Sequence, residues 1–81
     1  MNKICLLCDL NPGETATVGN IDKKGSMRRR LHDLGFTPGT EVKCVLKSPG
    51  GDMRAYRIKG AVIALREADS ADIEISGREG E

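Results

Sequence analysis

The sequence predicts a small, mainly β domain in which about five short strands close, or nearly close, into a barrel, with one short α-helix at about residues 26–35. Three observations support this fold class. Short segments of alternating apolar and polar residues recur, ten glycines and three prolines supply turns, and one stretch has helical spacing of its apolar residues. We assign the whole chain, 1–81, to one domain with a core at about 9–75 and a flexible tail at 76–81.

The first predicted strand covers residues 14–21 and follows a turn at Asn11-Pro12-Gly13. Its β-branched residues favour an extended backbone. Because side chains alternate along a strand, Ala16 and Val18 fall on one face and Ile21 on the other. Residues 22–25 then break the strand.

A two-turn amphipathic helix is predicted over residues 27–34. Three apolar residues recur there at helical spacing, namely Met27, Leu31 and Leu34. Ser26 is a suitable N-cap, and Gly35 suits the left-handed residue that ends many helices. Since so short a helix is marginal in water, we expect its apolar stripe to dock onto the strands, with Phe36 closing over its end.

The remaining strands are predicted at about residues 41–47, 53–58, 61–65 and 73–75. In the first of them Val42, Cys44 and Leu46 alternate with polar residues, so this face should pack. The strand at 61–65 is apolar on both faces, which favours a central place in the sheet. Residues 66–72 should form one helical turn.

Turn geometry explains a further set of residues without any ligand. A positive φ, a close backbone approach or a fixed proline φ accounts for Gly35, Pro38, Gly39, Pro49, Gly50, Gly51 and Gly60. In the turn that contains Pro49, Gly50 is expected to take the positive φ. The sequence argues against a phosphate-binding loop, because Asp52 and a strand follow Gly51, where such a loop requires a Lys-Ser/Thr pair and a helix.

Composition narrows the class of protein. The longest apolar runs, 4–8 and 61–65, are too short to span a bilayer or to form a signal peptide, so we expect a cytoplasmic protein without membrane insertion. Three cysteines suit a reducing compartment. A net charge of +1 with one Tyr, one Phe and no Trp argues against a nucleic-acid partner. No nucleophile, base or open metal motif stands out, so we expect no enzyme.

Four segments together resemble the FeoA family: residues 27–40, 48–52, 55–60 and 63–66. The resemblance covers about residues 9–75. It implies one FeoA-like domain with an SH3-like β-barrel, in a bacterial cytosolic accessory protein of ferrous iron transport. It further implies a non-catalytic module that binds the cytosolic GTPase portion of the membrane transporter FeoB and aids its assembly or regulation. A similar domain occurs at the C-terminus of metal-dependent repressors.

The candidate partner-binding residues are Arg28, Arg29, Arg30, His32 and Tyr56. Arginines in the first turn oppose the helix macrodipole, so stability alone would not select them. One interpretation is a basic docking patch for an acidic partner or an anionic membrane surface. The alternative, which we weigh equally, is a solvated face with an Arg29–Asp33 ion pair. For Tyr56, half-buried packing is favoured over partner contact.

Metal binding is the alternative function. Cys5 and Cys8 have the spacing of half a zinc or redox site and suit Zn²⁺ or Fe²⁺. A complete site needs further ligands, and only Cys44 and His32 are available as soft or imidazole donors. The two N-terminal cysteines lie outside the segments that resemble the family. A small RNA-binding barrel is a second, weaker alternative, and self-association remains open.

The net charge is unevenly distributed. Residues 1–66 carry twelve basic and six acidic residues, whereas residues 67–81 carry one basic and six acidic residues. The sequence therefore predicts a basic body, suited to a partner of opposite charge, with an acidic C-terminal stretch that offsets it.

Overall fold

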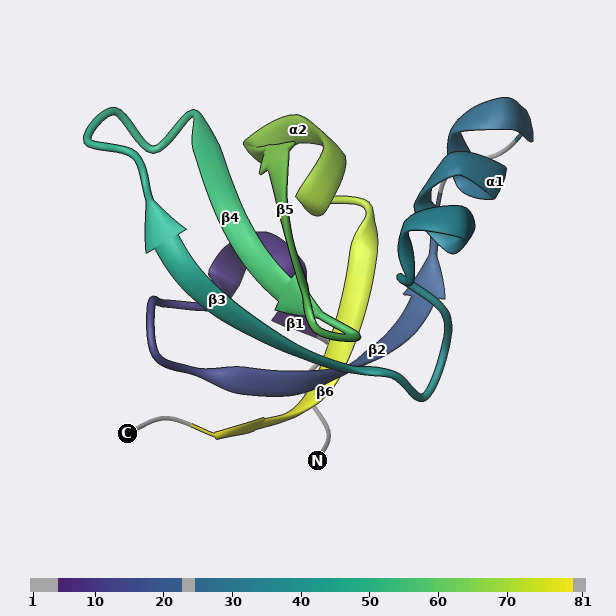
Figure 1. The fold of residues 1–81 in the computed structure, drawn as a ribbon, viewed down its shortest axis with the longest axis horizontal. Coiled ribbons are helices and arrows are strands. Elements are labelled where there is room, and N and C mark those ends of the chain that lie inside the picture. Colours follow the sequence, from purple (N-terminus) through teal and green to yellow (C-terminus); the bar gives the residue numbers. More distant parts are fainter. Residues whose placement is uncertain (1–4, 23–24, 80–81) are drawn as a thin grey trace.

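The computed structural model describes residues 5–22 and 25–79. One six-stranded antiparallel sheet forms most of the fold, and the helix α1 stands to one side of it (Figure 1). In chain order the elements are β1 (Cys5–Leu6), the 3₁₀ helix η1 (Leu7–Asp9), β2 (Thr15–Ile21), α1 (Gly25–Leu34), β3 (Glu41–Lys47), β4 (Met53–Ile58), β5 (Ala61–Arg66), α2 (Glu67–Ser70) and β6 (Ile73–Glu79). The mainly β class, the helix between early strands and the helical turn before the last strand are confirmed.

The sheet is not closed. Its strand order is β1-β6-β2-β3-β4-β5, so β1 and β5 are the two edges. The prediction of a central strand at 61–65 was wrong, since β5 is an edge strand in which only Leu65 is buried. Apolar residues of β5 line a groove beside the strand, and no second described strand packs there.

The sheet uses both ends of the chain. β6 lies between β1 and β2, with Cys5 opposite Ile75 and Thr17 opposite Ser76. The predicted flexible tail at 76–81 therefore starts at the wrong residue, because residues 76–79 belong to the paired strand β6. This polar segment is held in the sheet by backbone hydrogen bonds. Such bonds require no apolar side chains, so the sequence shows no alternating pattern from which this part of the strand could be predicted.

The core consists mainly of aliphatic side chains that surround two aromatic residues, Phe36 and Tyr56. Phe36 and Tyr56 pack edge to face, with ring centroids 6.4 Å apart and planes at 89°. Leu7 and Leu10 are also completely buried. The core therefore begins at the N-terminal segment, before the predicted boundary at residue 9.

Two irregularities change which side chains face this core. A register shift in β3 between Cys44 and Leu46 turns Leu46 outward, where it is 62% exposed. A second shift in β2 between Val18 and Ile21 turns Ile21 inward, where it is 4% exposed. Both residues were predicted on the opposite face, because strict alternation fails wherever a strand contains an extra residue.

Helix α1 ends as predicted. Gly35 has φ +115°. The Gly35 N–H donates a hydrogen bond to His32 O (3.0 Å), and the Phe36 N–H donates one to Leu31 O (3.0 Å). These two bonds form a Schellman motif, with buried Phe36 covering the helix end. The start differs, since α1 includes residue 25 and Ser26 therefore lies inside the helix and is not its N-cap.

The turns carry the predicted proline and glycine residues. Thr37, Pro38, Gly39 and Thr40 form a turn closed by the Thr40 N–H to Thr37 O bond of 3.1 Å. The hairpin turn after Ser48 contains Pro49, Gly50 and Gly51, and is closed by Gly51 N–H to Ser48 O at 2.9 Å. The positive φ in that turn falls on Gly51 (+78°) and not on Gly50, which corrects the prediction. Lys59 and Gly60 both have positive φ in the two-residue β4–β5 hairpin.

Candidate docking site

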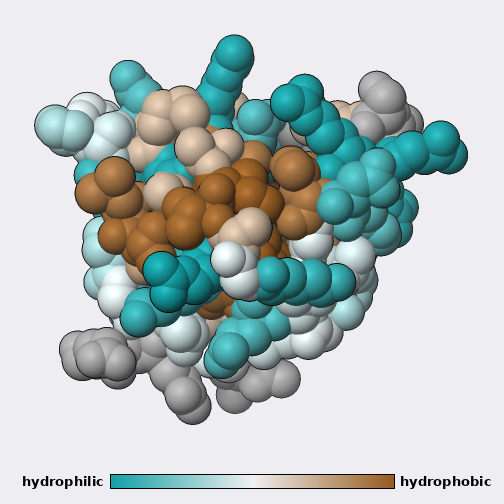
Figure 2. All heavy atoms as spheres, in the orientation of Figure 1, coloured by the Kyte–Doolittle hydropathy of each residue, from teal (hydrophilic) through white to brown (hydrophobic). Residues whose placement is uncertain are grey.

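A groove of about 440 Å³ separates α1 from β5. Figure 2 shows apolar residues gathered in a band across this face of the molecule. The groove is lined by Met27, Arg30, Leu31, Leu34, Met53, Ile63, Ala64, Leu65, Arg66 and Asp69. Met53 is 40% exposed and Leu34 36%, so apolar surface remains in contact with solvent along a wall that also carries two arginines.

The three arginines of α1 are all exposed, but they do not form one cluster. Arg30 lines the groove together with Arg66 of β5. Arg28 and Arg29 instead line a shallow hollow of about 370 Å³ on the outer face of the helix, with His32 and Asp33. Within the described ranges no ion pair joins Arg29 to Asp33, so the pairing expected for a purely solvated face is not formed.

His32 is half-buried, although the sequence placed it on the exposed helix face. Its Nε2 is buried and has no hydrogen-bond partner among the described residues. The ring thus lies partly beneath the helix surface, and its remaining exposed part contributes to the hollow beside Arg28 and Arg29.

Tyr56 lies in the core and not at the surface. Its side chain is completely buried, and its hydroxyl donates a hydrogen bond to Leu7 O at 3.3 Å. Burial raises the pKa of Tyr56 to about 12. The structure therefore contradicts partner contact by Tyr56 and places it in the packing role that the sequence favoured.

Arg54 is a residue that the sequence reasoning missed. It is 6% exposed, on the same face of β4 as Tyr56 and Ile58, and its Nη2 lies 3.3 Å from Glu67 Oε2 in α2. Its Nε and Nη1 are buried without a hydrogen-bond partner in the described part of the chain. Strand periodicity could have indicated this burial, because Arg54 lies two and four residues before the core residues Tyr56 and Ile58 and therefore on the same face of the strand.

The cysteines are not arranged as a metal site in the residues that the structure describes, where no three metal-ligating side chains cluster. Cys5 is half-buried and packs against the core, and Cys44 is completely buried. Burial raises the pKa of the Cys8 thiol, with a smaller contribution from the carboxylate of Asp9, and burial also raises the pKa of Cys44. Raised pKa values oppose the thiolate form that binds metal.

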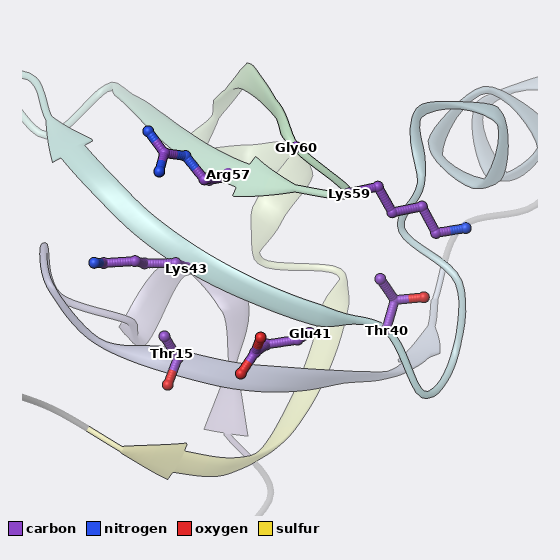
Figure 3. Close-up of a pocket in the computed structure, with 7 residues that line it drawn as sticks. All are labelled: Thr15, Thr40, Glu41, Lys43, Arg57, Lys59 and Gly60. Carbon is purple, nitrogen blue, oxygen red and sulfur yellow. The ribbon is translucent and has the colours of Figure 1, made fainter.

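A basic pocket of about 420 Å³ lies on the outer face of the sheet (Figure 3). Lys43 and Arg57 stand directly opposite each other on β3 and β4 and extend in the same direction, whereas Lys59 extends the opposite way. Like charges directly opposite on a sheet are unfavourable. No aromatic residue lines this pocket, so it lacks the stacking surface on which single-stranded nucleic acid binds.

The family model for the FeoA domain matches residues 5–77. This chain belongs to the FeoA family. The match begins at Cys5, whereas the resemblance was expected to begin at about residue 9, so it also spans Cys8. In the described residues of this FeoA domain, no helix is long and apolar enough to cross a membrane.

Related proteins share this domain. An Fe(2+) transport protein A/Fe(2+) transporter FeoB fusion protein of Porphyromonas gingivalis is 32% identical over 69 residues, which is 85% of this chain and 8% of that protein. The solution structure of iron(II) transport protein A from Clostridium thermocellum is 30% identical, with a TM-score of 0.85 over 89% of this chain and 44% of that one.

A zinc complex of Stenotrophomonas maltophilia FeoA, described as a prokaryotic SH3 domain protein, is 27% identical with a TM-score of 0.84, covering 94% of this chain and 96% of that one. The SH3-like fold expected from the resemblance is confirmed. A manganese-dependent transcriptional repressor shares the fold at 20% identity and a TM-score of 0.82.

Proposed function

We propose that this FeoA domain is a non-catalytic, cytoplasmic accessory module of ferrous iron transport that binds the cytosolic GTPase portion of a FeoB-type transporter and aids its assembly or regulation. The observation that carries the proposal is the Porphyromonas gingivalis relative, in which transport protein A and transporter FeoB are one polypeptide. Fusion keeps two modules at a high effective concentration, which favours pairs that act together.

The chemistry of the described residues supports a binding role. Catalysis by a thiol requires a thiolate, and burial raises the pKa of both Cys8 and Cys44. Tyr56 is buried and its pKa is raised to about 12, so it does not exchange protons near neutral pH. Exposed arginines line both the groove and the hollow, and apolar side chains line the groove.

The arrangement around α1 suits an acidic partner surface. Arg28 and Arg29 are exposed on the outer face, and Arg30 stands beside the apolar groove. Apolar surface next to exposed guanidinium groups can contribute both burial and charge-assisted hydrogen bonds to one interface. We therefore assign the docking surface to α1 and the groove.

Reversing the charge of the helix tests this assignment. The triple variant Arg28→Glu, Arg29→Glu and Arg30→Glu is expected to weaken binding of the transporter's purified cytosolic portion by about ten-fold or more, because repulsion replaces complementary charge. The dissociation constant is measured by isothermal titration calorimetry, alongside ferrous iron uptake in cells.

A matched control has the same change in net charge elsewhere. The triple variant Lys43→Glu, Arg57→Glu and Lys59→Glu reverses three charges of the basic pocket on the sheet and should bind within about three-fold of the wild type. Equal binding by the wild type and the helix variant would contradict docking through α1.

Transition-metal binding or sensing through Cys5 and Cys8 is the alternative proposal. The zinc complex of the Stenotrophomonas maltophilia FeoA is the one observation that favours it. In this chain both cysteines are half-buried, and Cys5 packs against the core. We therefore expect these thiols to contribute to packing more than to ligation.

Metal titration separates the two proposals. Anaerobic titration of Zn²⁺ and Fe²⁺ into the wild type and into the Cys5→Ser, Cys8→Ser variant should give the same weak binding, because two half-buried thiols do not complete a tetrahedral site. Stoichiometric binding that the double variant loses would establish the metal site instead.

A further inference from the structure

Strand β5 presents an open edge. All six of its residues pair in continuous register with β4, from Met53 opposite Arg66 to Ile58 opposite Ala61, and no other described strand pairs with it. Exposed edges are usually protected by a proline, a bulge or a central charge. β5 has a regular register and no charge before Arg66, and a groove separates it from α1, so none of these devices protects this edge among the described residues.

The hydrogen-bond phase shows which peptide groups are available. Glu67 N–H donates to Asp52 O at 2.8 Å, just beyond the end of β5. In an antiparallel pair, alternate residues bond to the partner strand and those between them point away. Continuing this phase back along β5, the backbone N–H and C=O groups of Val62, Ala64 and Arg66 point to the open edge.

The groove runs along this edge. Four consecutive residues of β5, 63–66, line it, although successive side chains of a strand point to opposite faces. Only a space alongside the backbone can contact both sets. The opposite wall is the apolar stripe of α1, including Met27 and Leu34. Unpaired peptide groups thus face an apolar wall across a groove of about 440 Å³.

We propose that this edge binds an extended segment of the protein partner by β-strand addition between β5 and α1. The inference rests on the proposed function and specifies how that partner docks. Peptide groups of the segment pair with Val62, Ala64 and Arg66, and alternate apolar side chains enter the groove. Acidic side chains at the intervening positions lie beside Arg30 and Arg66.

Charge complementarity selects this occupant over a second copy of the chain. β5 of a second copy would bring another Arg66 and no carboxylate, since its sequence is Ala-Val-Ile-Ala-Leu-Arg. Each groove carries two arginines and one carboxylate, Asp69, so two facing grooves would still hold an excess of positive charge, which is unfavourable. An acidic, amphipathic strand from a different protein removes that repulsion.

The variant Ala64→Pro tests the edge directly. Proline lacks the N–H group, and at an edge position whose N–H points outward it leaves the pairing with β4 intact. We expect binding of the transporter's purified cytosolic portion to weaken by about ten-fold or more. The comparison variant Ala64→Val retains the N–H group, so it should bind at least about ten-fold more tightly than Ala64→Pro. Circular dichroism and the thermal midpoint verify the fold of both variants.

Amide hydrogen exchange of the wild-type complex gives a second measurement that needs no variant. The amides of Val62, Ala64 and Arg66 should exchange at least about ten-fold more slowly in the complex than in the free protein. If the complex forms but these amides exchange as in the free protein and Ala64→Pro binds as tightly as Ala64→Val, strand addition is wrong and the proposed function survives. If the wild type forms no complex, both fail. A dimer of the free protein that protects the same amides would identify a second copy as the occupant and overturn the proposal.

Discussion

Replacing Tyr56 with alanine is expected to lower the free energy of unfolding by about 3–5 kcal/mol. The side chain is completely buried, packs edge to face on Phe36 and ties β4 to the N-terminal segment through Leu7 O. Since domains of this size have total stabilities of about 5–10 kcal/mol, this variant should be close to unfolded at 37 °C. Urea denaturation followed by circular dichroism measures the loss.

The variant Tyr56→Phe separates the hydroxyl from the ring and should lose about 1–2 kcal/mol at neutral pH. It also predicts a pH dependence. Burial raises the pKa of Tyr56 to about 12 in the folded state, against about 10 in the unfolded chain, so folding favours the neutral phenol. This stabilisation is complete below pH 10 and is lost as the pH rises from about 10 to 12, by about 2–3 kcal/mol.

Urea denaturation of the wild type and Tyr56→Phe across this pH range isolates the phenol, because the other titrating groups are common to both proteins. The stability difference between them should shrink and then reverse as the phenol ionises. Parallel stability curves over the whole range would show that Tyr56 is accessible to solvent, contrary to the structure.

Replacing Arg54 with methionine is expected to raise the free energy of unfolding by about 1–3 kcal/mol. The Arg54 side chain is 6% exposed, and its Nη2 has a single ion pair at 3.3 Å to the half-exposed Glu67. Its Nε and Nη1 have no partner among the described residues. Burying a charge with so few partners costs more than the ion pair returns. Methionine keeps the apolar stem and removes that cost.

Glu67→Gln is the opposite change and should lower stability, by about 1 kcal/mol, because it leaves the buried guanidinium without its carboxylate. Both variants are compared by urea denaturation at neutral pH. A loss of stability in Arg54→Met would contradict the prediction and show that Nε and Nη1 bind a group in solution, such as an anion or ordered water.

The parts of the fold that depend on local geometry could be predicted from the sequence. The end of α1 is an example, since Gly35 and Phe36 carry the Schellman motif within a few residues of the helix. The paired strands β3 and β4 are another, because a Pro-Gly turn and alternation define both of them. These features need no information about distant residues.

The errors arose where distant strands decide the outcome. The extra residues in β2 and β3 reverse the faces of Ile21 and Leu46, and their positions follow from pairing with neighbouring strands. β5 has the composition of a buried strand, yet its second face borders a groove whose other wall is contributed by α1, about thirty residues earlier in the chain.

The candidate site was predicted in part. Helical spacing placed Arg28 and Arg29 on the outer face of α1, where the structure has them. The groove could not be predicted from helical spacing, because it forms only where α1 and β5 come together in the folded domain. Burial of Arg54 was missed because charged residues seldom occupy core positions, so their type outweighed the strand periodicity.

The position of β6 also determines when this domain can fold. β6 follows the other strands of this sheet in the chain but lies between β1 and β2. Thr17 can therefore pair with Ser76, and Cys5 with Ile75, only after β6 has been synthesised. Contacts between residues about sixty to seventy positions apart slow folding, because a long loop must close before they form. During synthesis on the ribosome, β2 therefore keeps one edge unpaired until β6 has emerged, so the sheet is completed only after nearly the whole domain has been made.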